Sequence, residues 1–155
     1  MESIFLLKFL HALGASVLFG TGIGIAFFML MAHRTGHAGV IAVTARFVVI
    51  ADFIFTATAV VVQPVTGVAL AWAIGLSPLE EPWIVLSILI YVFVGLCWLP
   101  VVFIQIRMRN LANDAAVNGK PLPDLLFRIW FALGWPAFAG VIAIFALMTW
   151  QPRWW

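Results

Sequence analysis

Charged side chains are scarce in this chain of 155 residues. Lys, Arg, Asp and Glu together account for 9% of the residues, whereas 65% are hydrophobic, and the mean hydropathy is +1.16. A soluble domain of this length cannot hide so large an apolar fraction in its interior. The scarcity of charge therefore excludes an ordinary soluble domain and predicts an integral membrane protein in contact with the lipid bilayer.

Cysteine is equally scarce, since Cys97 is the only one in the sequence. A single thiol cannot form an internal disulfide or a thiolate metal cluster by itself. The net charge of +2 is small, and the basic residues lie in short loops rather than in a patch. We therefore predict no nucleic-acid partner.

Long apolar segments are what the sequence does have. They cover about residues 4–32, 47–74, 83–106 and 125–150, separated by short polar stretches. A spanning helix needs roughly 20 apolar residues, and in lipid a helix satisfies every backbone hydrogen bond internally. We predict an all-α membrane protein of one domain, residues 1–155, built as a four-transmembrane-helix bundle.

The distribution of Lys and Arg predicts the orientation of this bundle. Basic residues flank the first and third connections, whereas the second carries Glu80 and Glu81 and no base. Because cytoplasmic loops carry an excess of Lys and Arg, both termini are predicted to be periplasmic in a bacterial inner (cytoplasmic) membrane, crossed several times. The basic residues concerned are Arg34, Arg46, Arg107, Arg109, Lys120 and Arg128.

Two ionisable side chains interrupt the first apolar segment, "IFLLKFLHALGASVLFGTGIG". Lys8 lies near enough to the predicted boundary for its long stem to reach the headgroups. His11 lies about two turns deep, at ~1.5 Å per residue, and its short side chain cannot. Ionisable groups at such depth usually face the bundle interior and indicate function.

Polar residues on two other spans fall at the same predicted depth as His11. They are Gln63 and Thr66 on the second span, and Tyr91, with Ser87, on the third. Two interpretations are open: His11 is hydrogen-bonded to Gln63, Thr66 or Tyr91, or its free ring nitrogen ligates the iron of haem b.

Small residues in the first span indicate where another group comes close. Gly20 and Gly24 form a four-residue spacing typical of close helix packing, and Gly14 lies one turn after His11. The alternative is that these glycines leave room for a flat planar ligand. In the second span, Pro64 frees a backbone carbonyl, because proline has no N–H.

Asp52 is the other charged residue within a predicted span, in its cytoplasmic half. A carboxylate there is expected to pair with a base, and the candidates are Arg46, Arg107 and Arg128. The alternative is a carboxyl group that relays protons.

The run "MLMAHRTGH" raises an alternative function. It contains Met29, Met31, His33 and His37, and thioether and imidazole ligands suit Cu(I). Residues two apart on a helix face different ways, however. We keep copper transport or binding as an alternative function.

The first span, read as "LLKFLHALGASVLFG", resembles the opening of the bacterial haem-dependent protoporphyrinogen oxidases, which carry a Lys-x-x-His pattern matched by Lys8 and His11. The last segment is also similar to theirs, with Phe127 and Arg128 at its start and Pro152 after its end. The layout resembles the wider superfamily that includes copper-resistance D membrane domains, and within it a family of predicted bacterial integral membrane proteins.

This resemblance implies an inner-membrane haem-b redox protein. His11 would bind the iron, Gln63, Thr66 and Gly14 would border the cofactor, and Lys8 and Arg128 would attract the carboxylates of a porphyrinogen. Tyr91 would orient groups or relay protons, and electrons would pass to a quinone or the respiratory chain. The sequence also allows a non-enzymatic membrane subunit, in a homo-oligomer or a larger membrane complex, in which His11 is merely hydrogen-bonded.

Overall fold

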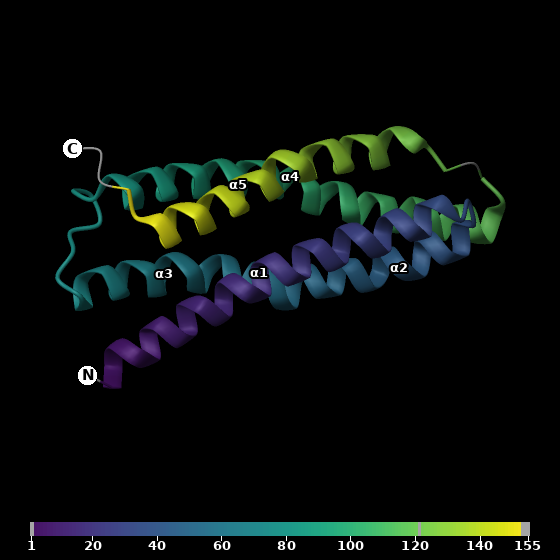
Figure 1. The fold of residues 1–155 in the computed structure, drawn as a ribbon. Helices are drawn as coiled ribbons and strands as arrows, with labels where there is room; N and C mark the ends of the chain where they lie inside the picture. The colour runs from purple at the N-terminus through teal and green to yellow at the C-terminus, as the bar shows by residue number, and fades with distance from the viewer. Residues whose placement is uncertain (1, 121, 153–155) are drawn as a thin grey trace.

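The computed structural model describes residues 2–120 and 122–152. Within these ranges the chain is helical and has no strands, and four helices are long and apolar enough to cross a membrane. The predicted fold class is thereby confirmed. The elements, shown in Figure 1, are α1 (Glu2–Arg34), α2 (Ala38–Ala51), the π-helical segment η1 (Asp52–Thr56), α3 (Ala57–Ala73), α4 (Pro82–Asn118) and α5 (Asp124–Trp150).

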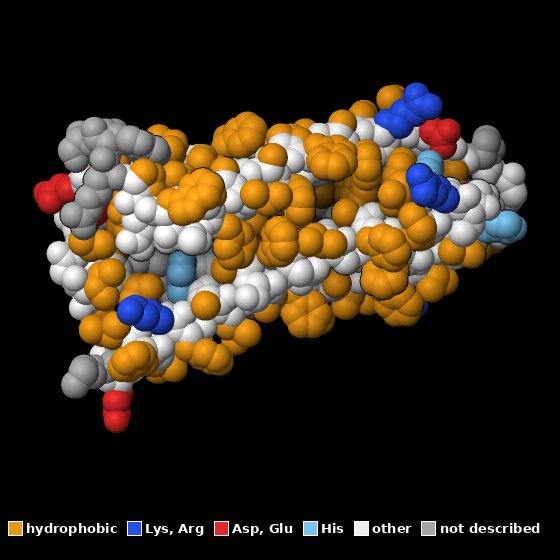
Figure 2. Space-filling view, in the orientation of Figure 1, with side chains coloured by type: hydrophobic (Ala, Val, Ile, Leu, Met, Phe, Trp, Pro, Cys, Tyr) orange, Lys and Arg blue, Asp and Glu red, His pale blue; other side chains and the backbone are white. Residues whose placement is uncertain are grey.

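The helices run along one long axis, with both ends of the chain at the same end of the bundle (Figure 1). We call this the terminal end; the opposite end, which holds the α1–α2 and α4–α5 connections, is the loop end. Helix α1 packs mainly against α3 and α2, α4 packs mainly against α5 and α2, and α1 packs less extensively against α5. Figure 2 shows Lys and Arg side chains at the loop end beside an acidic one. Which end faces the cytoplasm stays a prediction from the charge distribution.

Two helices extend well beyond the predicted apolar spans. Helix α2 begins at Ala38 and α4 ends only at Asn118. The reason is a buried stripe of residues at helical spacing on each extension: Ile41 and Ala45 on α2, and Met108, Ala112 and Ala115 on α4. These stripes pack the extensions against each other, so the helices continue although charged residues interrupt their hydropathy.

Residues 38–73 form one long helix whose middle is a π turn. In η1 the wider winding brings Asp52 and Thr56 to the interior, and both are buried. A π turn adds one residue to a helical turn and so rotates the inward face of the helix beyond it. As a result, α2 packs mainly against α4, whereas α3 packs mainly against α1. Such turns are often found at functional sites.

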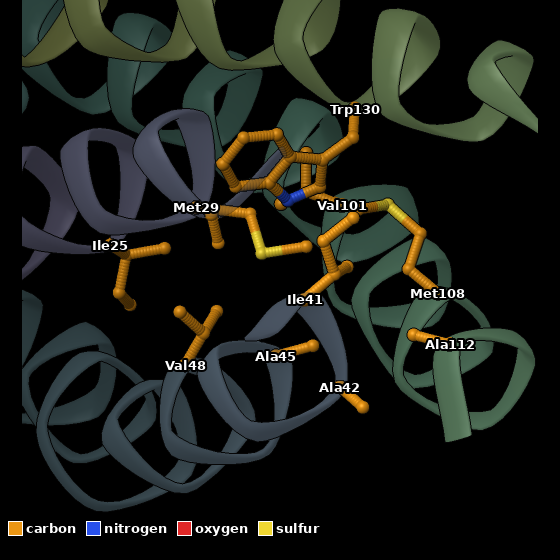
Figure 3. Close-up of a cluster of buried hydrophobic side chains, with 11 residues drawn as sticks. Ile25, Met29, Ile41, Ala42, Ala45, Val48, Val101, Met108, Ala112 and Trp130 are labelled. Carbon is orange, nitrogen blue, oxygen red and sulfur yellow. The ribbon is translucent and has the colours of Figure 1, made fainter. Parts of the chain in front are cut away.

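The largest apolar core lies in the loop half of the bundle and draws on α1, α2, α4 and α5. Figure 3 shows Trp130 of α5 extending toward Met29 of α1 and Val101 of α4. A smaller cluster of Ala71, Trp83 and Ile84 joins α3 to α4 near the terminal end. Apolar side chains therefore hold α4 to its neighbours in both halves of the bundle.

The predicted close approach of another helix at Gly20 and Gly24 is wrong. No atom lies within 4 Å of a Cβ placed at either position. Both glycines instead line grooves: Gly24 borders one of about 490 Å³ between α1 and α2, and Gly20 borders one of about 440 Å³ between α1 and α5. Close approach occurs instead at Gly14, Gly67 and Gly140.

Candidate functional site

His11 lies between α1 and α3 in the terminal half of the bundle, half-buried. Its Nδ1 lies 3.0 Å from the Thr66 hydroxyl oxygen, and Thr66 is buried. The convergence of His11 and Thr66, predicted from their depth alone, is confirmed. Ionisable and polar groups in the apolar interior need such partners, because lipid offers none.

Hydrogen bonding around Thr66 indicates which ring nitrogen of His11 carries the proton. A hydroxyl has one proton to donate, and that of Thr66 points to the Val62 carbonyl at 2.8 Å, with Gln63 O at 3.2 Å. With the Thr66 proton directed to a carbonyl in this way, His11 Nδ1 donates to the Thr66 oxygen. In the neutral ring this leaves the lone pair on Nε2, which makes no hydrogen bond to any residue in 2–120 or 122–152.

Two glycines make room for the polar side chains of this site. A Cβ at Gly67 would lie 3.0 Å from His11 Cε1, so the imidazole packs directly on the α3 backbone. A Cβ at Gly14 would lie 3.3 Å from Gln63 Nε2, which donates to the His11 carbonyl at 2.9 Å. Each helix therefore omits a side chain where the other inserts a polar one.

Gln63 also leaves one polar atom unused. Its Oε1 is buried and has no hydrogen-bond partner among the described residues. Buried amide oxygens are normally paired, so an unpaired one is a place where a water or ligand group would be accommodated. The sequence-predicted set of His11, Gln63, Thr66 and Gly14 is thus brought together in one cluster.

Tyr91 approaches the same region from α4. Its hydroxyl donates to the Val60 carbonyl of α3 at 2.6 Å. That carbonyl is available because the residue four positions later is Pro64, which has no N–H. Tyr91 therefore replaces the missing helix bond and ties α4 to α3, while Ser87, one turn away, bonds to the Trp83 carbonyl of its own helix at 2.6 Å.

Lys8 and Arg128 are not brought together. Lys8 is exposed one turn before His11, at the terminal end of the bundle. Arg128 is exposed in the first turns of α5, which begins at the loop end (Figure 1). One ligand cannot contact both side chains at once.

Asp52 forms the centre of a second polar cluster, in the loop half. The predicted ion pair with an arginine is wrong: among the described residues no base lies within salt-bridge distance of Asp52. Its Oδ1 instead accepts a hydrogen bond from Trp98 Nε1 at 3.3 Å. The candidate arginines are exposed on the bundle surface, where their long side chains reach solvent or headgroups more easily than the interior.

Gln105 and Trp130 complete this cluster, and sequence reasoning missed both. With its amide oriented to satisfy its neighbours, Gln105 donates to Asp52 Oδ2 at 2.9 Å and accepts from Trp130 Nε1 at 3.2 Å. Gln105 is only 2% exposed. The sequence could have indicated Gln105, because it is a single amide in an apolar run and a polar group in lipid needs a partner.

The residues of the copper alternative have different surroundings and different partners. Met29 is part of the apolar core, whereas His33 stacks on Phe127 with centroids 3.8 Å apart and places Nε2 3.4 Å from Asp124 Oδ1. His37 is exposed and contacts the Thr35 carbonyl through Nδ1 at 2.7 Å. Within the described ranges no three His, Cys, Asp or Glu side chains are grouped to hold a metal ion.

Comparison with known proteins gives a family and no individual relative. No curated protein and no solved structure matches the chain. The resemblance to the haem-dependent oxidases therefore stays a prediction from the first and last spans. A family described as "Predicted integral membrane protein (DUF2269)" matches residues 5–152, nearly the whole chain, so the protein belongs to this family of integral membrane proteins.

Proposed function

We propose that this protein is a haem-b redox protein of the membrane, with His11 as the iron ligand. The observation that carries the proposal is the 3.0 Å contact between His11 Nδ1 and the Thr66 hydroxyl. With Nδ1 as the donor and the Thr66 proton on the Val62 carbonyl, the lone pair of Nε2 is free. Haem-ligating histidines typically donate their other ring N–H to a neighbouring acceptor, which fixes the tautomer and the ring orientation.

The surroundings of His11 fit a bound haem in two respects. The imidazole is held against Gly67 and cannot turn freely, and the unpaired Gln63 Oε1 offers a polar contact. His11 would hold the iron through one bond, and a second ligand would come from Gln63, Tyr91, Lys8 or water.

Haem, when bound, supplies the one-electron chemistry of the reaction. The protein would hold and orient the group and exclude water from it. A hydrophobic tetrapyrrole substrate of the porphyrinogen class, with electrons passed to a quinone, is the version of the reaction that the family resemblance favours. Of the two predicted carboxylate-binding side chains, Lys8 is the one near His11, so that role falls to Lys8 rather than Arg128.

The absorbance of the purified protein tests the proposal. Protein from haem-replete cells should show a Soret band, which His11→Ala should abolish while leaving a monodisperse helical protein. His37→Ala is the matched control, because His37 is exposed at the loop end and should leave the band unchanged. Thr66→Val should keep the fold but lower haem affinity about 10- to 100-fold, the usual effect of losing the partner of a ligating histidine.

Other outcomes point to the alternatives. A colourless wild-type protein, or an unchanged Soret band in His11→Ala, would remove the haem assignment. His11 would then serve to join α1 to α3, and the protein would be better described as a non-enzymatic subunit of a larger membrane complex.

A further inference from the structure

The Asp52 carboxylate is buried at 3% exposure in the middle of the long helix formed by residues 38–73. Its described hydrogen-bond donors, Trp98 and Gln105, are both uncharged. Trp130 donates to Gln105 Oε1 and so directs the amide nitrogen of Gln105 toward Asp52. These contacts suit an ionised carboxylate, but they add no positive charge to offset it.

The charged and titratable groups on the surrounding helices are turned elsewhere. Helix α3 has none in its sequence, and on α1 His33 contacts Asp124. A carboxylate without a counter-charge is costly inside a membrane and marks a functional site by default. Arg109 donates to Asn110, and Lys120 pairs with Asp114. The remaining groups of this half are the buried thiol of Cys97 and five exposed side chains: Arg34, His37, Arg46, Arg107 and Arg128.

Thr56 provides the second, independent observation. It lies on the same π turn as Asp52, close to its carboxyl group, and is 7% exposed. Its hydroxyl oxygen is buried and makes no hydrogen bond within the described residues. A buried hydroxyl is rarely left unpaired. Because a hydroxyl can both donate and accept, the Thr56 hydroxyl is placed to donate to the ionised carboxylate of Asp52 and to accept from its protonated form.

We propose that Asp52 is a proton-binding site within the membrane, at which the carboxylate takes up one proton and the new O–H group donates to the Thr56 hydroxyl oxygen. The proton comes from the aqueous phase, one O–H bond forms and no other bond changes. Trp98 and Gln105 donate to the ionised form, and the Thr56 hydroxyl can donate to that form and accept from the protonated one. The site therefore has hydrogen-bond partners for both states, and this does not depend on haem at His11.

The chain offers a direct way to observe this group. Its three aspartates are Asp52, Asp114 and Asp124, and the last two lie at the loop end with partly or largely exposed side chains. In an Asp114→Asn/Asp124→Asn background, carbon-13-labelled aspartate reports on Asp52 alone without changing it. Infrared spectra of this protein in lipid should show the C=O band of a protonated carboxylic acid that appears as the pH is lowered and disappears reversibly as it is raised.

Removal of the carboxyl group gives the complementary test. The labelled band should be absent when Asp52→Asn is added. Thr56→Val should shift the band position, because the acceptor of the new O–H bond is lost. Thr58→Val is the control, because its exposed hydroxyl bonds to the Ile54 carbonyl and should leave the band in place.

Two results would overturn the proposal. One is a carboxylate signal that stays ionised at every pH at which the helices remain intact by circular dichroism. The other is a signal that responds to sodium or potassium concentration and not to pH, which would identify a metal-cation site instead.

Discussion

At the scale of single residues, Trp130 acts on Asp52 through Gln105: its indole N–H donates to the Gln105 amide oxygen, and the Gln105 amide nitrogen donates to Asp52. Trp130→Phe keeps most of the ring in the core but leaves Gln105 Oε1 buried without its donor. Such an unpaired group costs about 1–3 kcal/mol. The free energy of unfolding in detergent should fall by that amount, whereas Trp135→Phe, at a side chain 61% exposed, should change it little. Equal effects of the two substitutions would mean that the indole N–H does not hold Gln105.

The two polar clusters differ in how far the sequence could predict them. His11 and Thr66 were predicted because both fall at one depth and carry donors and acceptors that lipid cannot satisfy. The partners of Asp52 were mispredicted because opposite charge was the criterion, whereas the interior stabilises this carboxylate with an amide and an indole. Neither of these side chains is distinguishable from ordinary span residues by charge.

At the scale of elements, α4 and α5 form the most extensive helix pair, and Gly140 sets their separation. A Cβ at Gly140 would lie 2.5 Å from Val94 Cγ2 and 3.3 Å from Ile90 Cγ2. Gly140→Ala should therefore push the helices apart and cost about 1–3 kcal/mol, the usual effect of overpacking. Unfolding of the detergent-solubilised protein measures this.

The control and the rescue for this pair are both available in the chain. Gly134→Ala lies on the same helix, where a Cβ meets no atom within 4 Å, and should be tolerated. Val94→Ala combined with Gly140→Ala should recover stability, because it removes the contacted methyl group. Failure of this rescue would show that the cost arises elsewhere in the helix.

The helices themselves were predictable, but their ends and the π turn were not. Apolar runs of this length fix the number of spans. The apolar runs, however, end at the first charged residues. Helices α2 and α4 continue beyond them because buried residues at helical spacing, such as Ile41 with Ala45 and Met108 with Ala112, pack their extensions. The π turn at Asp52–Thr56 has no composition signal, because it depends on how two halves of one helix face different neighbours.

At the scale of the whole molecule, the bundle separates two polar clusters along its axis. The His11 cluster joins α1 to α3 near the terminal end, and the Asp52 cluster joins η1 to α4 and α5 nearer the loop end. Trp83 and Tyr91 link the two helix pairs at the terminal end.

The orientation of the molecule decides which membrane face each cluster approaches, and single cysteines can measure it. In a Cys97→Ala background, Ser77→Cys places a thiol in the exposed α3–α4 connection at the terminal end, and Lys120→Cys places one at the exposed loop end. The excess of basic residues at the loop end predicts that this end is cytoplasmic.

A membrane-impermeant thiol reagent added to spheroplasts should therefore label Ser77→Cys at once, but Lys120→Cys only after the membrane is opened with detergent. The reverse pattern would place the termini in the cytoplasm, and His11 would then lie in the cytoplasmic half with Asp52 toward the outer one.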